Sequence, residues 1–149
     1  MDRLITFSGV DGSGKSTQIE LLTRRLEEDG ERPELLRKRV VLADRWVWDT
    51  TIDLQLRFPE LGMGLEGWMS STAALVPRPT ASFLFLVSDR VADERQRAKQ
   101  EPFPDSPDTA AARRQMYRQL AKNSNLTLID ADRNRETVHQ DIWDRVVEG

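Results

Sequence analysis

The sequence has 149 residues, a net charge of −3 and 32% charged side chains of both signs, which is the size and composition of one domain. This mildly acidic balance argues against a general nucleic-acid-binding protein, which is usually basic, although it leaves room for a local basic patch. Cysteine is absent and His139 is the single histidine, so disulfides, thiolate metal sites and catalysis by a histidine pair are excluded.

The first ten residues, MDRLITFSGV, lack the long apolar region of a secretory signal. The longest apolar run, residues 83–87, is far too short to span a bilayer. We therefore expect a cytoplasmic protein that binds neither a membrane nor nucleic acid.

Hydrophobic periodicity predicts the elements of the first half. Residues 4–8 (LITFS) are a short buried strand, and residues 16–28 are a helix with Ile19, Leu22 and Leu26 on one face. A second buried strand, 40–43 (VVLA), precedes a helix over 49–57, and FPELGMG forms a loop because of its proline and glycines. A helix over 65–75 and a third strand, 82–87 (SFLFLV), follow.

The second half continues the alternation with a charged helix over 89–100, an exposed loop (EPFPDSPD), a helix over 109–121, a strand over 126–129 and a closing helix over 134–147. Val138, Ile142 and Val146 share one face of the last helix, and Asn134 is a natural N-cap. Short apolar strands separated by helices predict an α/β fold in three layers, a parallel sheet with helices on both faces. We expect residues 1–149 to form a single domain.

The stretch GVDGSGKST follows the first strand and opens the first helix. Gly9, four residues, and then Gly14, Lys15 and Ser16 match the phosphate-loop pattern. Glycines let the loop curl so that its backbone N–H groups and the positive end of the helix surround a polyphosphate. A glycine-rich turn without a ligand is the alternative, and the strand–loop–helix context favours nucleotide binding over it. The residues expected to bind the nucleotide are Gly9, Gly12, Ser13, Gly14, Lys15, Ser16 and Thr17.

Within this loop, Lys15 places a charge between the outer phosphates, the Ser16 hydroxyl is a ligand for Mg²⁺, and Thr17 reaches an inner phosphate. A second magnesium-supporting carboxylate usually stands at the end of a strand beside the loop, and Asp44 occupies that place. Strand alternation points Asp44 and Arg45 apart, so the arginine faces a different anion. An ordinary surface ion pair is the alternative for this Asp-Arg pair.

Arginines and lysines gather in residues 95–118, namely Arg95, Arg97, Lys99, Arg113, Arg114 and Arg118. One interpretation is a mobile lid over about residues 93–108 that brings cations onto the transferring phosphoryl group. The other is a solvated charged helix, because acidic residues are interspersed. Spacing alone leaves both open.

Together these stretches resemble the thymidylate kinase family of P-loop nucleoside monophosphate kinases. GVDGSGKST matches the phosphate loop of that family, including an aspartate, Asp11, two residues after the first glycine. VVLADRW matches its Asp-Arg-aromatic strand end, and ALVPRPTASFLFLVSDRVADERQR matches its strand leading into the arginine-bearing lid. LTLIDA and the final helix fit the end of the family. The resemblance implies a P-loop NTPase fold and the reaction of dTMP with ATP to give dTDP and ADP.

The resemblance also implies roles for single residues. Lys15 and Ser16 would hold ATP and Mg²⁺, and Asp44 would support the metal and the reacting centre. Asp11 would contact the sugar of the acceptor, and Arg45 would bind its phosphate. Gly12 stands where some members carry an arginine, so the catalytic cation would come from the lid, from Arg95 or Arg97. The substrates would be small-molecule nucleotides, and a homodimer is an expectation because the family is often dimeric.

Two departures from the family limit these expectations. Members are considerably longer between residues 30 and 40, where they insert a strand, an acceptor loop and a helix that stacks on the base. A direct strand–helix–strand crossover would still close the core if the two remaining strands are neighbours. In DRWVWDTTIDLQLRF, the usual serine- and tyrosine-containing continuation is replaced by Trp48, Asp49 and Asp53. We expect Trp46 and Trp48 to pack in the core instead of lining an acceptor pocket, and the acceptor can therefore differ from dTMP.

Three other functions remain open on the sequence alone. The chain would be a P-loop kinase for a hydroxyl-bearing small molecule, a nucleotide-binding module that has lost its acceptor site, or a regulatory NTPase. No base-recognition motif for GTP is evident for the third.

Overall fold

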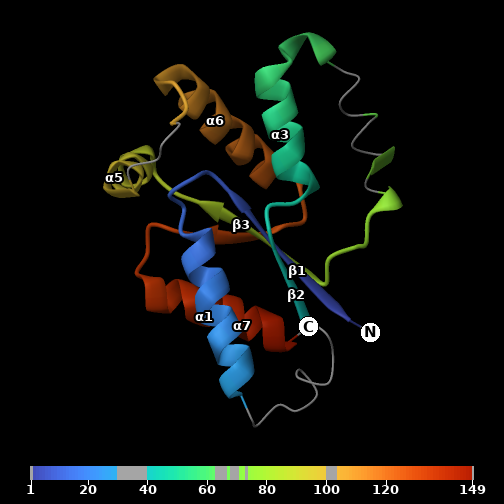
Figure 1. Ribbon diagram of the computed structural model, residues 1–149, viewed down its shortest axis with the longest axis vertical. Coiled ribbons are helices and arrows are strands. Elements are labelled where there is room, and N and C mark those ends of the chain that lie inside the picture. Colours follow the sequence, from blue (N-terminus) through green and yellow to red (C-terminus); the bar gives the residue numbers. More distant parts are fainter. Residues whose placement is uncertain are drawn as a thin grey trace.

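The computed structural model describes residues 2–29, 40–62, 67, 71–72, 74–99 and 104–148. The elements labelled in Figure 1 follow the predicted alternation of strands and helices. In chain order they are β1 (Arg3–Gly9), α1 (Lys15–Glu28), β2 (Val40–Asp44), α3 (Val47–Arg57), the 3₁₀ turn η1 (Pro59–Leu61), β3 (Ala81–Leu86), α5 (Asp89–Lys99), α6 (Pro107–Asn123), β4 (Thr127–Asp130) and α7 (Arg135–Glu148).

The four strands form one parallel sheet in the order β2-β1-β3-β4. In the centre, Ile5 of β1 pairs with Leu42 of β2 on one side and with Ala81 of β3 on the other. Since β1 and β2 are direct neighbours, the short crossover expected from the sequence is present. The residues that make the link, 30–39, lie outside the described residues. Because all strands are parallel, their carboxyl ends meet at one edge, where ligands bind in open α/β sheets.

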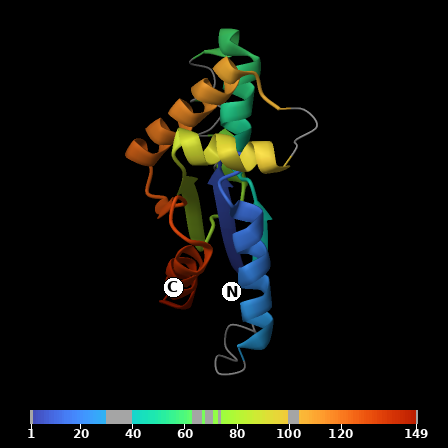
Figure 2. The same ribbon diagram turned by 90° about the vertical axis from the view of Figure 1, so that its left-hand side faces the viewer.

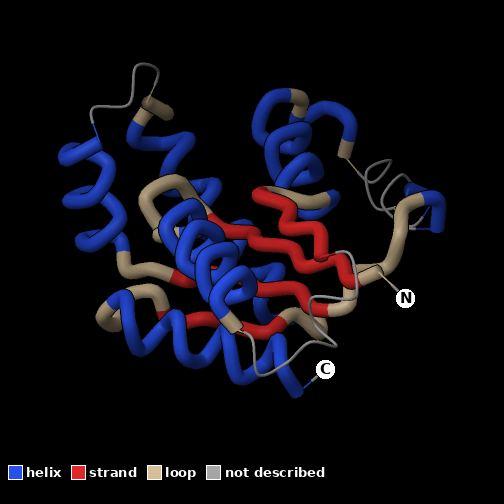
Figure 3. The backbone as a smooth tube through the Cα atoms, turned by 60° about the horizontal axis from the view of Figure 1, so that its bottom comes forward, coloured by secondary structure: helices blue, strands red, loops and turns tan. Residues whose placement is uncertain are grey.

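Helices cover both faces of the sheet, as predicted. Arg3 donates a hydrogen bond to the Val146 carbonyl of α7, whereas Ser8 donates one to Asp49 of α3. Residues 3 and 8 differ in strand parity and therefore point to opposite faces. α1 packs with α7, and α3 packs with α6, so these pairs form the two outer layers (Figures 1 and 3). The three-layer α/β prediction is confirmed.

The apolar stripes predicted for the first and last helices form the core on the α1–α7 face. Leu22 of α1 and Ile142 of α7 are fully buried, and Ile19 packs against the core at its margin. Asn134 caps α7, because its side-chain oxygen accepts a hydrogen bond from Thr137 N at 2.8 Å. Local pattern therefore determines these elements correctly.

The observed boundaries differ from the predicted ones by at most two residues, and one predicted loop is partly helical. FPELGMG contains η1, and α3 begins at Val47 instead of residue 49. The helix expected over 65–75 is helical at the described positions 67, 71, 72, 74 and 75, and its other residues lie outside the described part. In that same part of the chain, every helix is too short or too polar to cross a bilayer.

Candidate active site

The phosphate loop is folded so tightly that a side chain would collide with the backbone at Gly9 and would be crowded at Gly12. Gly9 has φ +142°, and a Cβ there would lie 2.7 Å from the Phe85 carbonyl oxygen of β3. Gly12 has φ +79°, and its Cβ would lie 3.3 Å from the Ala92 carbonyl oxygen of α5. These backbone angles favour glycine, and the close approach lets α5 lie across the carboxyl ends of the strands (Figure 2).

Lys15 is the first residue of α1 and is 6% exposed. Its Nζ donates to the carbonyl oxygens of Gly9 at 2.9 Å and Val10 at 3.0 Å, so the loop wraps around the amine. Burial lowers the pKa of Lys15 below its ordinary value, against the raising effect of the nearby Asp11 and Asp44 carboxylates. The amine is thus held at the loop by carbonyl oxygens and nearby negative charge.

The loop residues fit a polyphosphate, and two polar groups fit a magnesium ion beside it. The buried Ser13 hydroxyl has no hydrogen-bond partner within the loop, and the start of the 14-residue helix α1 favours an anion. The described residues contain no cluster of three His, Asp or Glu side chains that would cage a metal by itself. Magnesium is commonly held by one or two protein groups together with substrate phosphates, which matches Ser16 and Asp44.

A cavity of about 480 Å³ brings together most of the residues singled out from the sequence. Among the predicted site residues, Gly9 and Arg97 do not line it. Those that do are Asp11, Gly12, Ser13, Gly14, Lys15, Ser16, Thr17, Asp44, Arg45 and Arg95.

Arg45 leaves the strand in a left-handed backbone conformation, with φ +77°. Only a few per cent of non-glycine residues adopt this region. Its N–H still donates to the Phe7 carbonyl at 2.9 Å, so the chain turns immediately after pairing with β1. Because of this turn, strand alternation no longer separates Asp44 from Arg45, and both side chains line the same cavity.

The Arg45 guanidinium lies between two carboxylates. It contacts Asp11 of the phosphate loop at 2.9 Å and Asp53 of α3 at 3.4 Å. Partial burial acts to lower the pKa of Arg45, but the carboxylates of Asp11 and Asp53 outweigh it and raise the pKa above its ordinary value. The acceptor-side cation predicted from the sequence is therefore fixed in place and fully charged.

Asp49, named from the sequence only as a departure from the family, is 1% exposed and accepts four hydrogen bonds. The hydroxyls of Ser8 and Tyr117 each donate to it at 2.6 Å. Trp46 N donates at 2.8 Å and Gly9 N at 3.4 Å. Burial, and then the Asp49 charge, raise the pKa of Tyr117, so the phenol stays protonated. This carboxylate joins the phosphate loop, the Arg45 turn, α3 and α6.

The two arginines of the predicted lid differ in position, and residues 100–103 of that segment lie outside the described residues. Arg95 of α5 lines the cavity and donates to the Ala131 carbonyl at 2.9 Å and to the Gly12 carbonyl at 3.4 Å. Arg97 is exposed. The geometry therefore brings Arg95 to the phosphate loop and leaves Arg97 away from it.

Two further cations, Arg133 and Arg135, also line the cavity, and the sequence reasoning missed both of them. They follow β4, in the stretch ADRNRE. The signal that would have found them is topological: residues just after a parallel strand lie at the same edge as the phosphate loop.

The tryptophans of the Asp-Arg segment are not core residues, contrary to the expectation. Trp46 and Trp48 are half-buried, and Trp46 lines a second cavity of about 400 Å³ with Arg45, Val47, Thr50 and Thr72. The reason is their place at the carboxyl edge of the sheet, where the chain leaves the two covered faces. Arg45 lines both cavities and connects them.

Comparison with known proteins supports the resemblance seen in the sequence. No protein-family model matches the chain. A thymidylate kinase of Halothermothrix orenii is 26% identical over 205 aligned positions, which cover 95% of each chain. A thymidylate kinase of Rhodopirellula baltica is 37% identical over 86 residues, 58% of this chain and 28% of that protein. One of Bradyrhizobium is 56% identical over 36 residues, 24% of this chain and 16% of that protein.

The first of these alignments is longer than the 149-residue chain, so it contains gaps opposite residues of the relative. This agrees with the shortening noted in the sequence.

Solved structures support the fold. Deoxyadenosine kinase from M. mycoides with bound dATP has a TM-score of 0.70 at 12% identity, covering 96% of this chain and 98% of that one. The same enzyme with bound dCTP has a TM-score of 0.67 at 12% identity, covering 98% and 100%. The chain is therefore similar in sequence to thymidylate kinases, and it shares the fold of the solved deoxyadenosine kinase.

Proposed function

We propose that the chain catalyses Mg²⁺-dependent transfer of the γ-phosphoryl group of ATP to a nucleoside monophosphate, with dTMP or a close relative as the acceptor. One observation carries the proposal: Lys15 and the start of α1 share a cavity with Asp11, Asp44 and Arg45. A loop suited to a polyphosphate therefore faces the carboxylates and the arginine that a second, anionic substrate requires. The thymidylate kinases among the sequence relatives support the same reaction class.

On the donor side, Lys15 and the loop N–H groups hold the outer phosphates of ATP, and Thr17 holds an inner one. Ser16 and Asp44 would hold Mg²⁺, which would supply charge neutralisation at the nucleotide phosphates. Arg95 supplies a further cation at the transferring group, since it already contacts the loop. These residues lower the barrier by positioning and by charge neutralisation, without a covalent enzyme intermediate.

On the acceptor side, Arg45 binds the phosphate and Asp11 contacts the sugar. A phosphate oxygen of the acceptor attacks the γ-phosphorus in line, a new P–O bond forms, the bond to the bridging oxygen breaks, and ADP leaves. Closure of the 93–108 lid excludes water and limits ATP hydrolysis. The proposal is of a single-domain cytoplasmic enzyme for small-molecule nucleotides, and a homodimer is part of the expectation drawn from the family.

A kinase that phosphorylates a hydroxyl is the second candidate. The observation in its favour is that Arg45 already contacts two carboxylates, Asp11 and Asp53. An acceptor phosphate must displace at least one of them, whereas a neutral acceptor need not.

The test is ADP release from Mg-ATP with a panel of nucleoside monophosphates and the matching nucleosides. The variants are Lys15→Ala and Arg45→Ala, and Lys122→Ala, an exposed lysine near the end of α6, is the matched control. We expect turnover with a monophosphate that Lys15→Ala abolishes and Lys122→Ala preserves. Arg45→Ala should raise the acceptor KM by about 10- to 100-fold, the worth of a hydrogen bond to a charged group.

Turnover with nucleosides alone, together with an acceptor KM that Arg45→Ala leaves unchanged, would overturn the monophosphate acceptor in favour of the second candidate. ATP binding without turnover of any acceptor would overturn both and leave a nucleotide-binding module.

A further inference from the structure

Asp53 of α3 contacts Arg45 at 3.4 Å, just outside the two cavities that this arginine lines. Val47 and Thr50 of this helix line the second cavity together with Arg45. Residues three apart lie on one helix face, so Asp53 continues the face formed by Val47 and Thr50. Its side chain is 45% exposed, which leaves it accessible to a ligand bound at Arg45.

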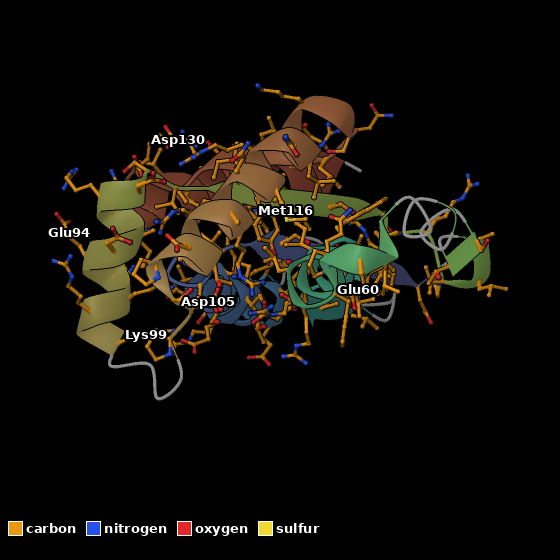
Figure 4. The ribbon with its side chains drawn as sticks, turned by 90° about the horizontal axis from the view of Figure 1, so that it is seen from above. Glu60, Glu94, Lys99, Asp105, Met116 and Asp130 are labelled. Carbon is orange, nitrogen blue, oxygen red and sulfur yellow. The ribbon has the colours of Figure 1, made fainter. Side chains whose placement is uncertain are left out.

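Two arginines hold the Asp53 carboxylate by different oxygens. Oδ2 accepts from Arg45 at 3.4 Å, and Oδ1 accepts from Arg113 of α6. Arg113 is 17% exposed and also donates to Asp105 at 2.7 Å. Figure 4 shows Asp105 from above, beside α6, with Lys99 and Glu60 on either side of it. The two arginines thereby fix the orientation of the carboxylate next to Arg45.

We propose that Asp53 is a specificity-determining residue that accepts a hydrogen bond from a hydroxyl group on the sugar of the acceptor, with Arg113 as its positioning residue. The inference rests on the proposed function and names a part of that same site. A carboxylate is an acceptor-only group with about four lone-pair sites, and the two arginines occupy two. The free sites therefore select a hydrogen-bond donor.

The distance from Arg45 identifies the donor as a sugar hydroxyl. If Arg45 holds the acceptor phosphate, a group within reach of Asp53 lies close to that phosphate. In a nucleoside monophosphate the sugar is joined directly to the phosphate and the base lies beyond it. A phosphate oxygen itself does not serve, because two anions repel.

The plainer explanation is that Asp53 only neutralises the mostly buried Arg113. Asp105 already contacts the Nε of that arginine, and this explanation does not require the second contact to Arg45. The two explanations also differ in their consequences. A purely structural Asp53 affects all acceptors alike, whereas a hydroxyl-binding Asp53 affects only acceptors that carry the hydroxyl.

The experiment compares kcat/KM for monophosphates of one base that differ only in the sugar: ribose, 2′-deoxyribose and 3′-deoxyribose. The enzymes are the wild type, Asp53→Ala, Asp53→Asn, Arg113→Gln and Arg113→Lys. Asp144→Ala removes an exposed, hydrogen-bonded carboxylate of α7 and is the matched control. Circular dichroism confirms that each variant is folded.

In the wild type, loss of one hydroxyl should lower kcat/KM by about 10- to 100-fold, as expected for a hydrogen bond to a charged group. Asp53→Ala should reduce that ratio at least about threefold, while Asp144→Ala keeps it. Any discrimination that remains in Asp53→Ala is assigned to the sugar contact proposed for Asp11. Arg113→Gln should reduce the ratio in part, and Arg113→Lys should restore some of it. Asp53→Asn, nearly the same size, gives the same test if the alanine variant does not fold.

A sugar ratio that Asp53→Ala or Asp53→Asn leaves at the wild-type value would overturn the inference and leave the kinase proposal intact. A wild type that discriminates among none of the sugars would do the same. A wild type that turns over no monophosphate overturns the proposed function, and the role of Asp53 with it.

Discussion

Replacing Asp49 with alanine removes a carboxylate that accepts from four donors in three parts of the chain. Two of the donors are hydroxyls, on Ser8 and Tyr117, which can rotate toward other acceptors. The other two are the backbone N–H groups of Trp46 and Gly9, which cannot. The variant therefore leaves buried backbone donors without partners and removes two short charge-assisted hydrogen bonds.

Each buried donor left unpaired costs about 1–3 kcal/mol, and each hydrogen bond to a charged group contributes about 1.5–3 kcal/mol. Removal of the buried charge offsets part of this loss. We expect Asp49→Ala to lower the free energy of unfolding by about 3–5 kcal/mol, or Tm by roughly 6–20 °C for a domain of this size. Asp49→Asn keeps one oxygen for Trp46 N and Ser8, and it should cost only about 1–2 kcal/mol.

Urea unfolding followed by circular dichroism measures these differences by linear extrapolation. Tyr117→Phe removes a single donor and should cost about 1 kcal/mol, and Asp144→Asn on the exposed face of α7 is the control. The acceptor KM gives a second readout, because Trp46 N follows directly after the strained Arg45. The acceptor KM should rise in Asp49→Ala and stay near the wild-type value in Asp49→Asn. An alanine variant within about 1 kcal/mol of the wild type would refute the reasoning.

Two further predictions concern catalysis and pH. Arg95→Ala should lower kcat at least about 10-fold more than Arg97→Ala, because Arg95 lines the cavity and Arg97 does not. Steady-state kinetics with saturating ATP measure the two kcat values. Equal effects of the two substitutions would contradict the assignment. Partial burial and then Arg25 lower the pKa of His139 below 6.5, so the unfolded chain binds more protons just below pH 6.5 and stability rises with pH through that window. Thermal melts of His139→Gln between pH 5 and 7 should show a flatter Tm profile than the wild type, and identical profiles would exclude the histidine as the cause.

Local sequence patterns were sufficient for the layers of the fold and for the phosphate loop. Helix and strand periodicities identify the face of each element that is buried, as Leu22 and Ile142 illustrate. The loop was recognisable because its geometry permits few residue types: a side chain at Gly9 would collide with the β3 backbone. Because this backbone conformation requires glycine at fixed positions, the glycine spacing in the sequence predicts the conformation.

The burial of Asp49 was beyond such reasoning. An aspartate near the start of a helix is ordinarily an exposed capping residue, and the sequence alone offered no reason to place this one in the core. Its partners Ser8 and Tyr117 are 41 and 68 residues away in sequence, and no periodicity links them. The helix begins at Val47 because Asp49 accepts the Trp46 N–H from within the first turn.

The proposed acceptor side was the least predictable part of the site, because its residues are linked by ion pairs between separate elements. Arg113 stood out only as one of several arginines in a charged stretch. The structure distinguishes it, since it is the arginine that shares Asp53 with Arg45. Charge in the sequence identifies candidates, and the choice among them depends on which helices the fold brings together.

The two aspartates of α3 show how one helix can serve both halves of such a site. Asp49 and Asp53 are four residues apart and lie on one face, but their surroundings differ: Asp49 is buried among four donors, and Asp53 is half-exposed between two arginines. The buried carboxylate has no exposed surface to offer a ligand, so its effect on chemistry must pass through the backbone turn that presents Arg45. The exposed one keeps free lone pairs beside that same arginine. A change at Asp49 should therefore alter how well every acceptor binds, whereas a change at Asp53 should alter which acceptor binds best.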